Sequence, residues 1–219
     1  MNEAAPHPVD PRRASATAQC WSCGGALAPE ALFCAACRSV QPPRALDHFA
    51  RLGLSVDFAL DENELDRRYF AFQRQLHPDR FATRSARERA ISQSQAVALN
   101  EAYRVLKDPL SRADYLLKLK GIAANPDGCH TISDPTILME QWERRENLLS
   151  AKTAGQAAAI ASEALSHVKE SVAAIADAFH RDDLDAAGRE TTRLKYLVKL
   201  VDEARGRKHA LAGERADAG

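Results

Sequence analysis

The chain has 219 residues, of which 45% are hydrophobic and 27% charged, a composition typical of a globular protein with one or two domains. Its 30 Lys and Arg residues balance its 30 Asp and Glu residues, so net charge gives no general attraction to nucleic acid or to an anionic membrane. No apolar run is long enough to span a bilayer and the opening residues lack the apolar core of a secretory signal, so we expect an intracellular chain without a membrane partner.

The chain begins with a segment for which we predict disorder, residues 1–18, and continues with a cysteine module over residues 19–41. Two Cys-x2-Cys pairs, separated by ten residues, can place four thiolates around one ion; they are Cys20 with Cys23 and Cys34 with Cys37. We predict one structural zinc ion, although iron in a four-sulfur site suits the same spacing. Disulfides are disfavoured in a reducing cytoplasm. Because so short a segment has little core, the metal would supply its folding free energy.

Helical patterns follow a Pro42-Pro43 hinge, and Ala- and Leu-rich segments without β-branched alternation predict an all-α protein. A short helix is expected over residues 46–52. A long helix should begin near Glu62, after a capping box formed by Asp61 and Glu64. Two apolar stripes at three- and four-residue steps predict a pair of long antiparallel helices; they comprise Leu65, Tyr69, Phe72, Leu76 and then Ala96, Leu99, Tyr103, Leu106. Asp108-Pro109 predicts a further helix from Pro109 to Leu119.

Between the two long helices lies the sequence His77-Pro78-Asp79. The residue before a proline is pushed out of the α region, so the first long helix should end here and leave the three residues on an exposed turn. Arg67, Arg68 and Arg74 point away from the apolar face of that helix. A rigid polar turn flanked by cations suits docking to an acidic partner better than it suits catalysis.

Glycine, asparagine and proline interrupt the helical pattern over residues 121–134, and Asp134-Pro135 then starts a second helical unit. Three helices are expected, over residues 135–149, 153–179 and 184–204, as an antiparallel bundle spanning about residues 134–205. Residues 206–219 are charged and contain glycine, so we expect them to fray. In the first of these helices, Leu138, Met139 and Trp142 spread wider than one packing stripe, which predicts exposed apolar surface.

These motifs resemble those of a J-domain, whose two long helices carry His-Pro-Asp at the tip of their hairpin. The likeness includes Asp47 to Leu54 (DHFARLGL) and Asn100 to Pro109 (NEAYRVLKDP). Ser111 to Leu117 (SRADYLL) and Leu138 to Glu146 (LMEQWERRE) resemble one branch, the iron-sulfur co-chaperones of the HscB type. The resemblance implies a J-domain over residues 46–120, a C-terminal three-helix bundle, and a small zinc-ribbon-like knuckle module before them.

The resemblance also implies a function. The His-Pro-Asp turn would engage a heat-shock chaperone of the HscA/DnaK class and stimulate its ATP hydrolysis, so the chain itself would not be an enzyme. Asp79 would offer a carboxylate to a chaperone arginine, while Arg67, Arg68 and Arg74 would face an acidic patch. The bundle would hold the scaffold protein on which iron-sulfur clusters are assembled; the residues implied are Leu138, Met139, Trp142, Glu143, Glu146 and Tyr196.

The cysteine module resembles an N-terminal extension that some HscB proteins carry, including the mitochondrial type. We expect it to act as a tether or a dimerisation aid, which would give a homodimer, because four protein ligands leave no open position for chemistry. A bacterial cytoplasm is favoured over a mitochondrial matrix. The alternatives are a general J-protein for unfolded clients and a zinc-ribbon nucleic-acid adaptor. The adaptor is disfavoured because Arg38 is the sole cation in residues 19–41, and we expect no nucleic-acid partner.

Overall fold

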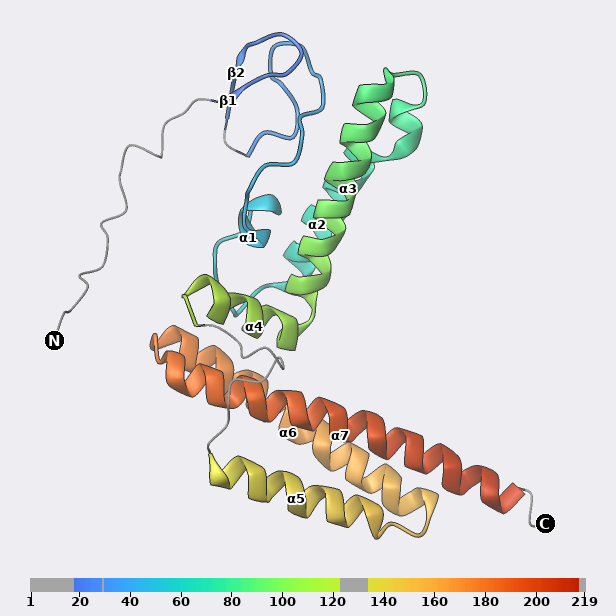
Figure 1. Cartoon of the computed structure of the whole chain (residues 1–219). Helices are drawn as coiled ribbons and strands as arrows, with labels where there is room; N and C mark the ends of the chain where they lie inside the picture. The colour runs from blue at the N-terminus through green and yellow to red at the C-terminus, as the bar shows by residue number, and fades with distance from the viewer. Residues whose placement is uncertain (1–17, 29, 123–133, 217–219) are drawn as a thin grey trace, which may run out of the picture. The chain divides into compact units, whose positions relative to one another are not determined.

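The computed structural model describes residues 18–28, 30–122 and 134–216 and confirms an all-α chain with a small cysteine module (Figure 1). Residues 1–17, most of the predicted break at 121–134, and residues 217–219 lie outside the described residues. The chain forms two compact units: one holds the described residues up to Ser55 together with Asp66–Tyr103, and the other holds Val56–Leu65 and the described residues from Arg104 onward. Among the described residues no helix combines the length and apolar content needed to cross a membrane.

The first unit begins with the cysteine module, which is built from very short strands. Strand β1 (Ala18–Gln19) pairs antiparallel with β2 (Ala26–Leu27), and an isolated bridge joins Phe33 to Val40. One cluster of buried residues in the module contains Cys20, Leu27 and Cys34, and Val40 is buried as well. Two of these four residues are cysteines, so little apolar surface holds the module together.

The same unit contains most of the predicted helical hairpin. Helix α1 (His48–Arg51) is shorter than the predicted 46–52 and is capped by Asp47. Side-chain hydrogen bonds join helices α2 (Glu62–Leu76) and α3 (Ala86–Lys107), among them Tyr103 to Asp66, Tyr69 to Asn100, and Ser92 to the Leu76 carbonyl. From Asp66 to Leu76 along α2, the bonded residues of α3 run backwards, from Tyr103 to Ser92. The two helices are therefore antiparallel, which confirms the predicted hairpin.

In the second unit, two helices begin and end where the sequence predicts. Helix α4 (Pro109–Leu119) is capped by the Asp108 carboxylate, which accepts from Ser111 N at 2.8 Å. Helix α5 (Pro135–Leu149) is capped by Asp134, which accepts from Thr136 N at 2.9 Å. In both cases proline occupies the first turn, where its missing N–H costs no helical hydrogen bond.

Helices α6 (Ala154–His180) and α7 (Leu184–Ala216) complete the predicted three-helix bundle with α5. Thr153 and Gln156 form a capping box at the start of α6. One core cluster draws on all three helices; it contains Leu148, Ala161, Ala164, Leu200, Val201 and Ala204. A second cluster, of Leu117, Ala178 and Ala187, packs α4 against α6 and α7. The fold therefore keeps α4 in the same compact unit as the bundle.

Helix α7 is longer than the sequence predicts. We expected it to end near Ala204 and residues 206–219 to fray, but the helix continues to Ala216. The reason is tertiary packing: Leu211 is buried in a cluster with Ala151 and Ala157, which lie at the turn between α5 and α6 and at the start of α6. Burying a leucine compensates for the glycine and the charged residues of this segment.

Candidate functional site

The His-Pro-Asp turn lies at the tip of the hairpin and is exposed. Helix α2 ends at Leu76, and His77 has φ −58° and ψ 134°, the extended conformation expected before proline. Pro78 then starts the short 3-10 helix η2 (Pro78–Phe81), and His77 Nδ1 accepts from Asp79 N at 3.3 Å. The side chains of His77 and Asp79 are 56% and 90% exposed, whereas Phe81 is buried. The turn is thus anchored on one side and displays an imidazole and a carboxylate on the other.

The three predicted arginines of α2 are not equivalent. Arg67 and Arg74 are exposed. Arg68 is half-buried, and its guanidinium donates to the carbonyl of Gly53, with Leu52 O at 3.5 Å. Gly53 has φ 66°, which other residues adopt only with strain, and a Cβ there would lie 2.7 Å from Arg68 Nη1 and displace the guanidinium. Arg68 therefore fastens the end of α1 to α2, and Arg67 and Arg74 supply the exposed charge.

Helix α5 presents an exposed apolar surface. Leu138, Met139 and Trp142 are 49%, 59% and 63% exposed, while Ile137 and Leu148 are buried on the opposite side of the helix. Glu143 and Glu146 are also exposed. The apolar exposure predicted from helical spacing is confirmed. Sequence reasoning missed exposed Leu149, which follows Trp142 by seven residues and so lies on the same face.

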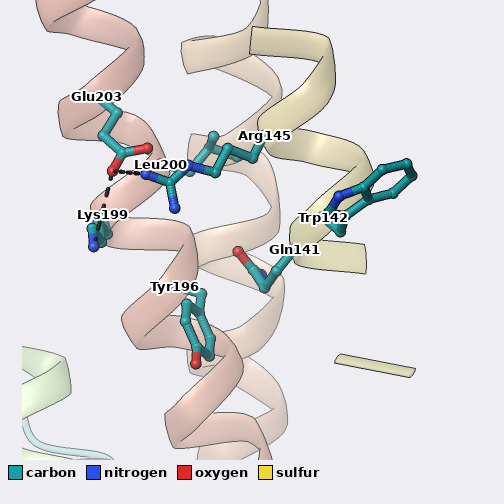
Figure 2. A pocket seen from close by; sticks show the side chains of 7 residues that line it. All are labelled: Gln141, Trp142, Arg145, Tyr196, Lys199, Leu200 and Glu203. Atoms are coloured by element: carbon teal, nitrogen blue, oxygen red, sulfur yellow. Dashed lines mark ion pairs between the residues drawn. The ribbon is translucent and has the colours of Figure 1, made fainter. Parts of the chain in front are cut away.

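Trp142 and Tyr196 line a common groove of about 200 Å³ between α5 and α7, although they are far apart in sequence (Figure 2). Arg145 reaches across from α5 to Glu203 on α7 at 3.7 Å, and Lys199 lies 4.0 Å from the same carboxylate (Figure 2). The rim of the apolar surface is therefore of mixed charge, whereas only its acidic part was predicted. The missed cations had a signal in the sequence, because Arg145 and Lys199 stand three residues after Trp142 and Tyr196.

A charge network beside this groove fixes α5 against α7. Arg193 on α7 donates to Glu140 on α5, with Nε to Oε2 at 3.2 Å, and also bonds Glu190. Burial lowers the pKa of Arg193, but the carboxylates of Glu190 and Glu140 outweigh it and raise that pKa overall. The guanidinium stays charged and holds the two helices in register.

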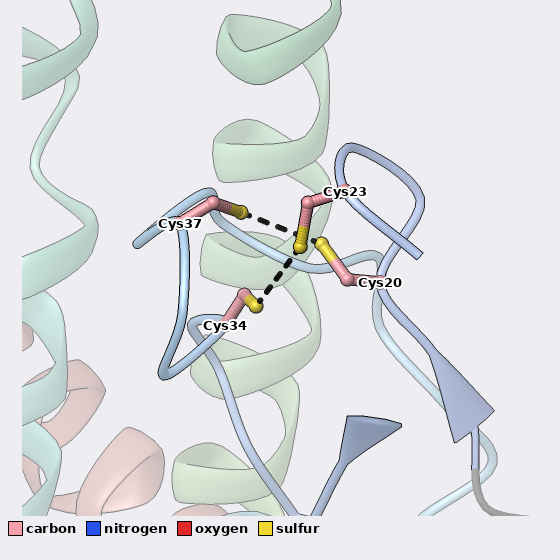
Figure 3. A group of neighbouring side chains, drawn as sticks. All are labelled: Cys20, Cys23, Cys34 and Cys37. Atoms are coloured by element: carbon pink, nitrogen blue, oxygen red, sulfur yellow. Dashed lines mark hydrogen bonds between the residues drawn. The ribbon is translucent and has the colours of Figure 1, made fainter. Parts of the chain in front are cut away.

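The four cysteines of the N-terminal module come together as predicted (Figure 3). Their Sγ atoms all lie within 4.8 Å of one another, and the pairs Cys20–Cys37 and Cys23–Cys34 are 3.6 and 3.7 Å apart. Four sulfurs at tetrahedral positions about 2.3 Å from a zinc ion would be about 3.8 Å apart. The donor set and its spacing therefore fit one metal ion bound by four thiolates.

The two cysteine pairs lie on matching turns. The backbone N–H of Cys20 donates to the Gly25 carbonyl, and the Cys20 carbonyl accepts from Gly24 N. Cys34 makes the same two bonds, with Ser39 and Arg38 respectively. The fourth residue after each first cysteine is left-handed, with φ 72° at Gly24 and φ 60° at Arg38. Glycine adopts this conformation readily, whereas arginine is strained in it.

The thiols differ widely in acidity. Hydrogen bonding with the Ser39 side chain is the main cause that lowers the pKa of Cys37 to about 6. At Cys23 a backbone hydrogen bond from Gly25 lowers the pKa, but the neighbouring Cys37 and Cys34 sulfurs raise it, to about 12 overall. Four thiolates so close together repel one another, and a bound cation would remove that repulsion.

Both helical parts of the chain match known protein families. Residues 47–115 match the DnaJ domain family, and residues 133–205 match the HSCB C-terminal oligomerisation domain family. The Arabidopsis thaliana iron-sulfur cluster co-chaperone HscB homolog is 35% identical over 187 residues, covering 85% of this chain and 73% of that protein. The human iron-sulfur cluster co-chaperone HscB is 33% identical, covering 87% and 82%, and the Vibrio cholerae HscB homolog is 36% identical, covering 72% and 94%.

Solved structures agree with the sequence matches. The crystal structure of human HscB superposes with a TM-score of 0.80 at 33% identity, covering 87% of this chain and 98% of that one. HscB from Vibrio cholerae gives a TM-score of 0.66 at 34% identity, covering 76% and 99%. This chain covers more than two thirds of the length of the Arabidopsis and human proteins, and it is more than 30% identical to each. It also matches both the DnaJ domain family and the HSCB C-terminal domain family. The chain belongs to the HscB family of J-domain iron-sulfur cluster co-chaperones.

Proposed function

We propose that this protein stimulates ATP hydrolysis by a heat-shock chaperone of the HscA/DnaK class and delivers an iron-sulfur scaffold protein to it. The observation that carries the first half is the exposed turn at the hairpin tip, where His77 and Asp79 point to solvent and η2 is anchored by buried Phe81. Asp79 can accept a charge-assisted hydrogen bond from a chaperone arginine. Exposed Arg67 and Arg74 can orient an acidic chaperone surface as it approaches.

The turn is tested by His77→Gln. We expect this variant to lose stimulation of the chaperone ATPase while its far-ultraviolet circular dichroism stays unchanged, because His77 is exposed and lies outside the helices. The measurement is steady-state ATP hydrolysis by a purified HscA-class chaperone as the co-chaperone is titrated. His180→Gln, at an exposed position at the end of α6, is the matched control and should stimulate like the wild type. Full stimulation by His77→Gln would refute the assignment.

The second half of the proposal rests on the exposed surface of α5. Leu138, Met139 and Trp142 form an apolar centre, and Glu143, Glu146 and the Tyr196 groove border it. Large apolar side chains surrounded by polar ones are typical of the residues that dominate protein–protein binding. A scaffold bound here would be brought to the chaperone by the same chain that carries the His-Pro-Asp turn.

Replacing Leu138, Met139 and Trp142 together with alanine should weaken scaffold binding by more than about tenfold, since dominant interface residues each contribute about 2 kcal/mol or more. Stimulation of the chaperone in the absence of scaffold should not change. Isothermal titration calorimetry with the purified scaffold measures the first effect and the ATPase titration measures the second. Leu165→Ala removes a partly exposed leucine from α6 and should bind the scaffold normally. Unaltered scaffold binding by the triple variant would leave a general J-protein as the better description.

For the cysteine module, we propose that the bound metal is one zinc ion with a structural role. The four-sulfur donor set and sulfur spacings near 3.7 Å support it, and no ligand position remains for substrate. Elemental analysis of the purified chain would identify the metal and its stoichiometry.

A further inference from the structure

The cysteine module and the helical hairpin are joined by specific contacts within one compact unit. Gln95 on α3 donates through Nε2 to the Gln41 carbonyl at 2.8 Å, and both residues are buried. The Arg87 guanidinium lies 4.3 Å from the centroid of the Trp21 ring, and Trp21 Nε1 donates to Val40 O at 2.7 Å. A buried hydrogen bond and a cation–π contact therefore fix the module beside α3.

A groove of about 350 Å³ lies where the module meets the hairpin tip. The module contributes Phe33 and Arg38, and the hairpin contributes Gln75, Arg80, Phe81, Arg84 and Glu88. Phe81 is buried and Phe33 is half-buried, so the aromatic side chains are apolar walls. Arg80 directly follows Asp79, which makes the groove continuous with the exposed turn.

The groove carries positive charge that the described part of the chain does not neutralise. Arg38, Arg80 and Arg84 are exposed, and none of these guanidiniums forms an ion pair or a side-chain hydrogen bond with another described residue. The single carboxylate, Glu88, accepts from Ser85 N at 3.2 Å and from Ser85 Oγ at 3.0 Å. A guanidinium group can bind a carboxylate through two parallel hydrogen bonds, so a groove with three guanidiniums suits an acidic peptide segment.

We infer that the cysteine module is part of the chaperone-docking face, and that Arg38, with Arg80 and Arg84, binds an acidic segment of the chaperone beside the His-Pro-Asp turn. This inference rests on the proposed function of the turn. Charge complementarity and continuity with the turn support this occupant, because Arg80 is exposed and adjoins Asp79, the residue proposed to contact the chaperone. The backbone of Arg38 adds support. Arg38 holds a left-handed conformation that strains an arginine, whereas Gly24 occupies the matching position of the first Cys-x2-Cys turn without strain, so a function of the Arg38 side chain would account for its presence there.

The test is charge reversal on each side of the groove. Arg38→Glu and Arg84→Glu should each raise the concentration of co-chaperone that gives half-maximal ATPase stimulation by about threefold to fivefold, the size of effect that exposed charge pairs give. The maximal stimulation should not change, because His77 and Asp79 are intact. The shift should shrink in high salt, since the distance over which exposed charges interact falls from about 8 Å at physiological ionic strength to about 3 Å at 1 M. Arg189→Glu, at an exposed position on α7, is the matched control and should cause no shift.

The metal content of Arg38→Glu, measured first, shows whether the module has folded, and Arg84→Glu tests the groove from the hairpin without altering the module. If the wild type stimulates the chaperone and both variants have unchanged half-maximal concentrations, the inference fails while the proposed function stands. If both variants lose binding to the scaffold instead, the groove serves another partner and the inference is overturned. If the wild type itself gives no stimulation, the proposed function fails and the inference fails with it.

Discussion

At the scale of single residues, Ser39 sets the acidity of one metal ligand. Its Oγ lies 3.4 Å from Cys37 Sγ, and this hydrogen bond is the main cause that lowers the pKa of Cys37 to about 6. Because that pKa is depressed, the Cys37 thiolate without a bound metal persists as pH falls toward about 6 and is lost below it. Protons and the metal compete for the same sulfur, so acidification favours release of the metal.

Ser39→Ala should therefore raise the pKa of Cys37 and move metal release to higher pH. The measurement is the fraction of zinc released to a chromogenic chelator as a function of pH, for the full-length chain. Ser22→Ala is the control, because Ser22 contacts Cys20 Sγ through its backbone N, which the substitution keeps. An identical release profile for Ser39→Ala and the wild type would contradict the role given to the hydroxyl.

At the scale of elements, the end of α7 depends on one side chain. Leu211 is the buried residue that holds the last turns of the helix, against Ala151 and Ala157. Leu211→Ala should lower the free energy of unfolding by about 2 kcal/mol, at the low end for buried leucines because the contact is near a helix end. It should also speed hydrogen exchange in residues 205–213.

Urea unfolding and hydrogen-exchange mass spectrometry measure these two effects. Leu165→Ala, at a partly exposed position of α6, should change both by much less. Unchanged exchange at the end of α7 in Leu211→Ala would show that intrinsic helix propensity alone sustains those turns.

Local sequence predicts the starts of two helices correctly but not the end of α7. Asp108-Pro109 and Asp134-Pro135 fix the starts of α4 and α5 because a capping carboxylate and a first-turn proline act within a few residues. The end of α7 was missed because its cause is a contact between Leu211 and two residues far earlier in the chain, Ala151 and Ala157. A boundary set by long-range packing leaves no local signal.

Some features of the candidate sites could likewise be predicted from local sequence, and others could not. The exposure of Leu138, Met139 and Trp142 was predictable, because the angle between positions on one helix is fixed by its geometry. The four-cysteine cluster was predictable because metal ligation dictates the spacing. The groove between Phe33, Arg38 and the hairpin tip was not, because it exists only once Gln41 and Gln95 have joined the module to α3.

At the scale of the whole molecule, we expect the cysteine module to depend on a bound metal ion far more than the bundle does. The module has two strands of two residues and a core cluster of Cys20, Leu27 and Cys34, with Ala18 against it. The bundle is held by clusters that draw on α5, α6 and α7. Loss of the metal should therefore unfold one part of the chain and leave the other intact.

Removing the metal with a strong chelator should increase hydrogen exchange across the module, residues 18–28 and 30–41, by at least about tenfold, since its folding free energy comes from the ion. Peptides from α6 and α7 are the internal control and should exchange at their original rates. Protection of the module that survived complete metal removal, confirmed by elemental analysis, would contradict this dependence.

The short helix η2 has a consequence for the speed of recognition. Its buried Phe81 and the bond from Asp79 N to His77 Nδ1 hold the turn in one conformation before any encounter. Binding therefore requires little loss of backbone entropy at the point of contact, and a small interface can suffice. A contact that is preorganised yet small can form and dissociate quickly, so the proposed encounter with a chaperone would be brief.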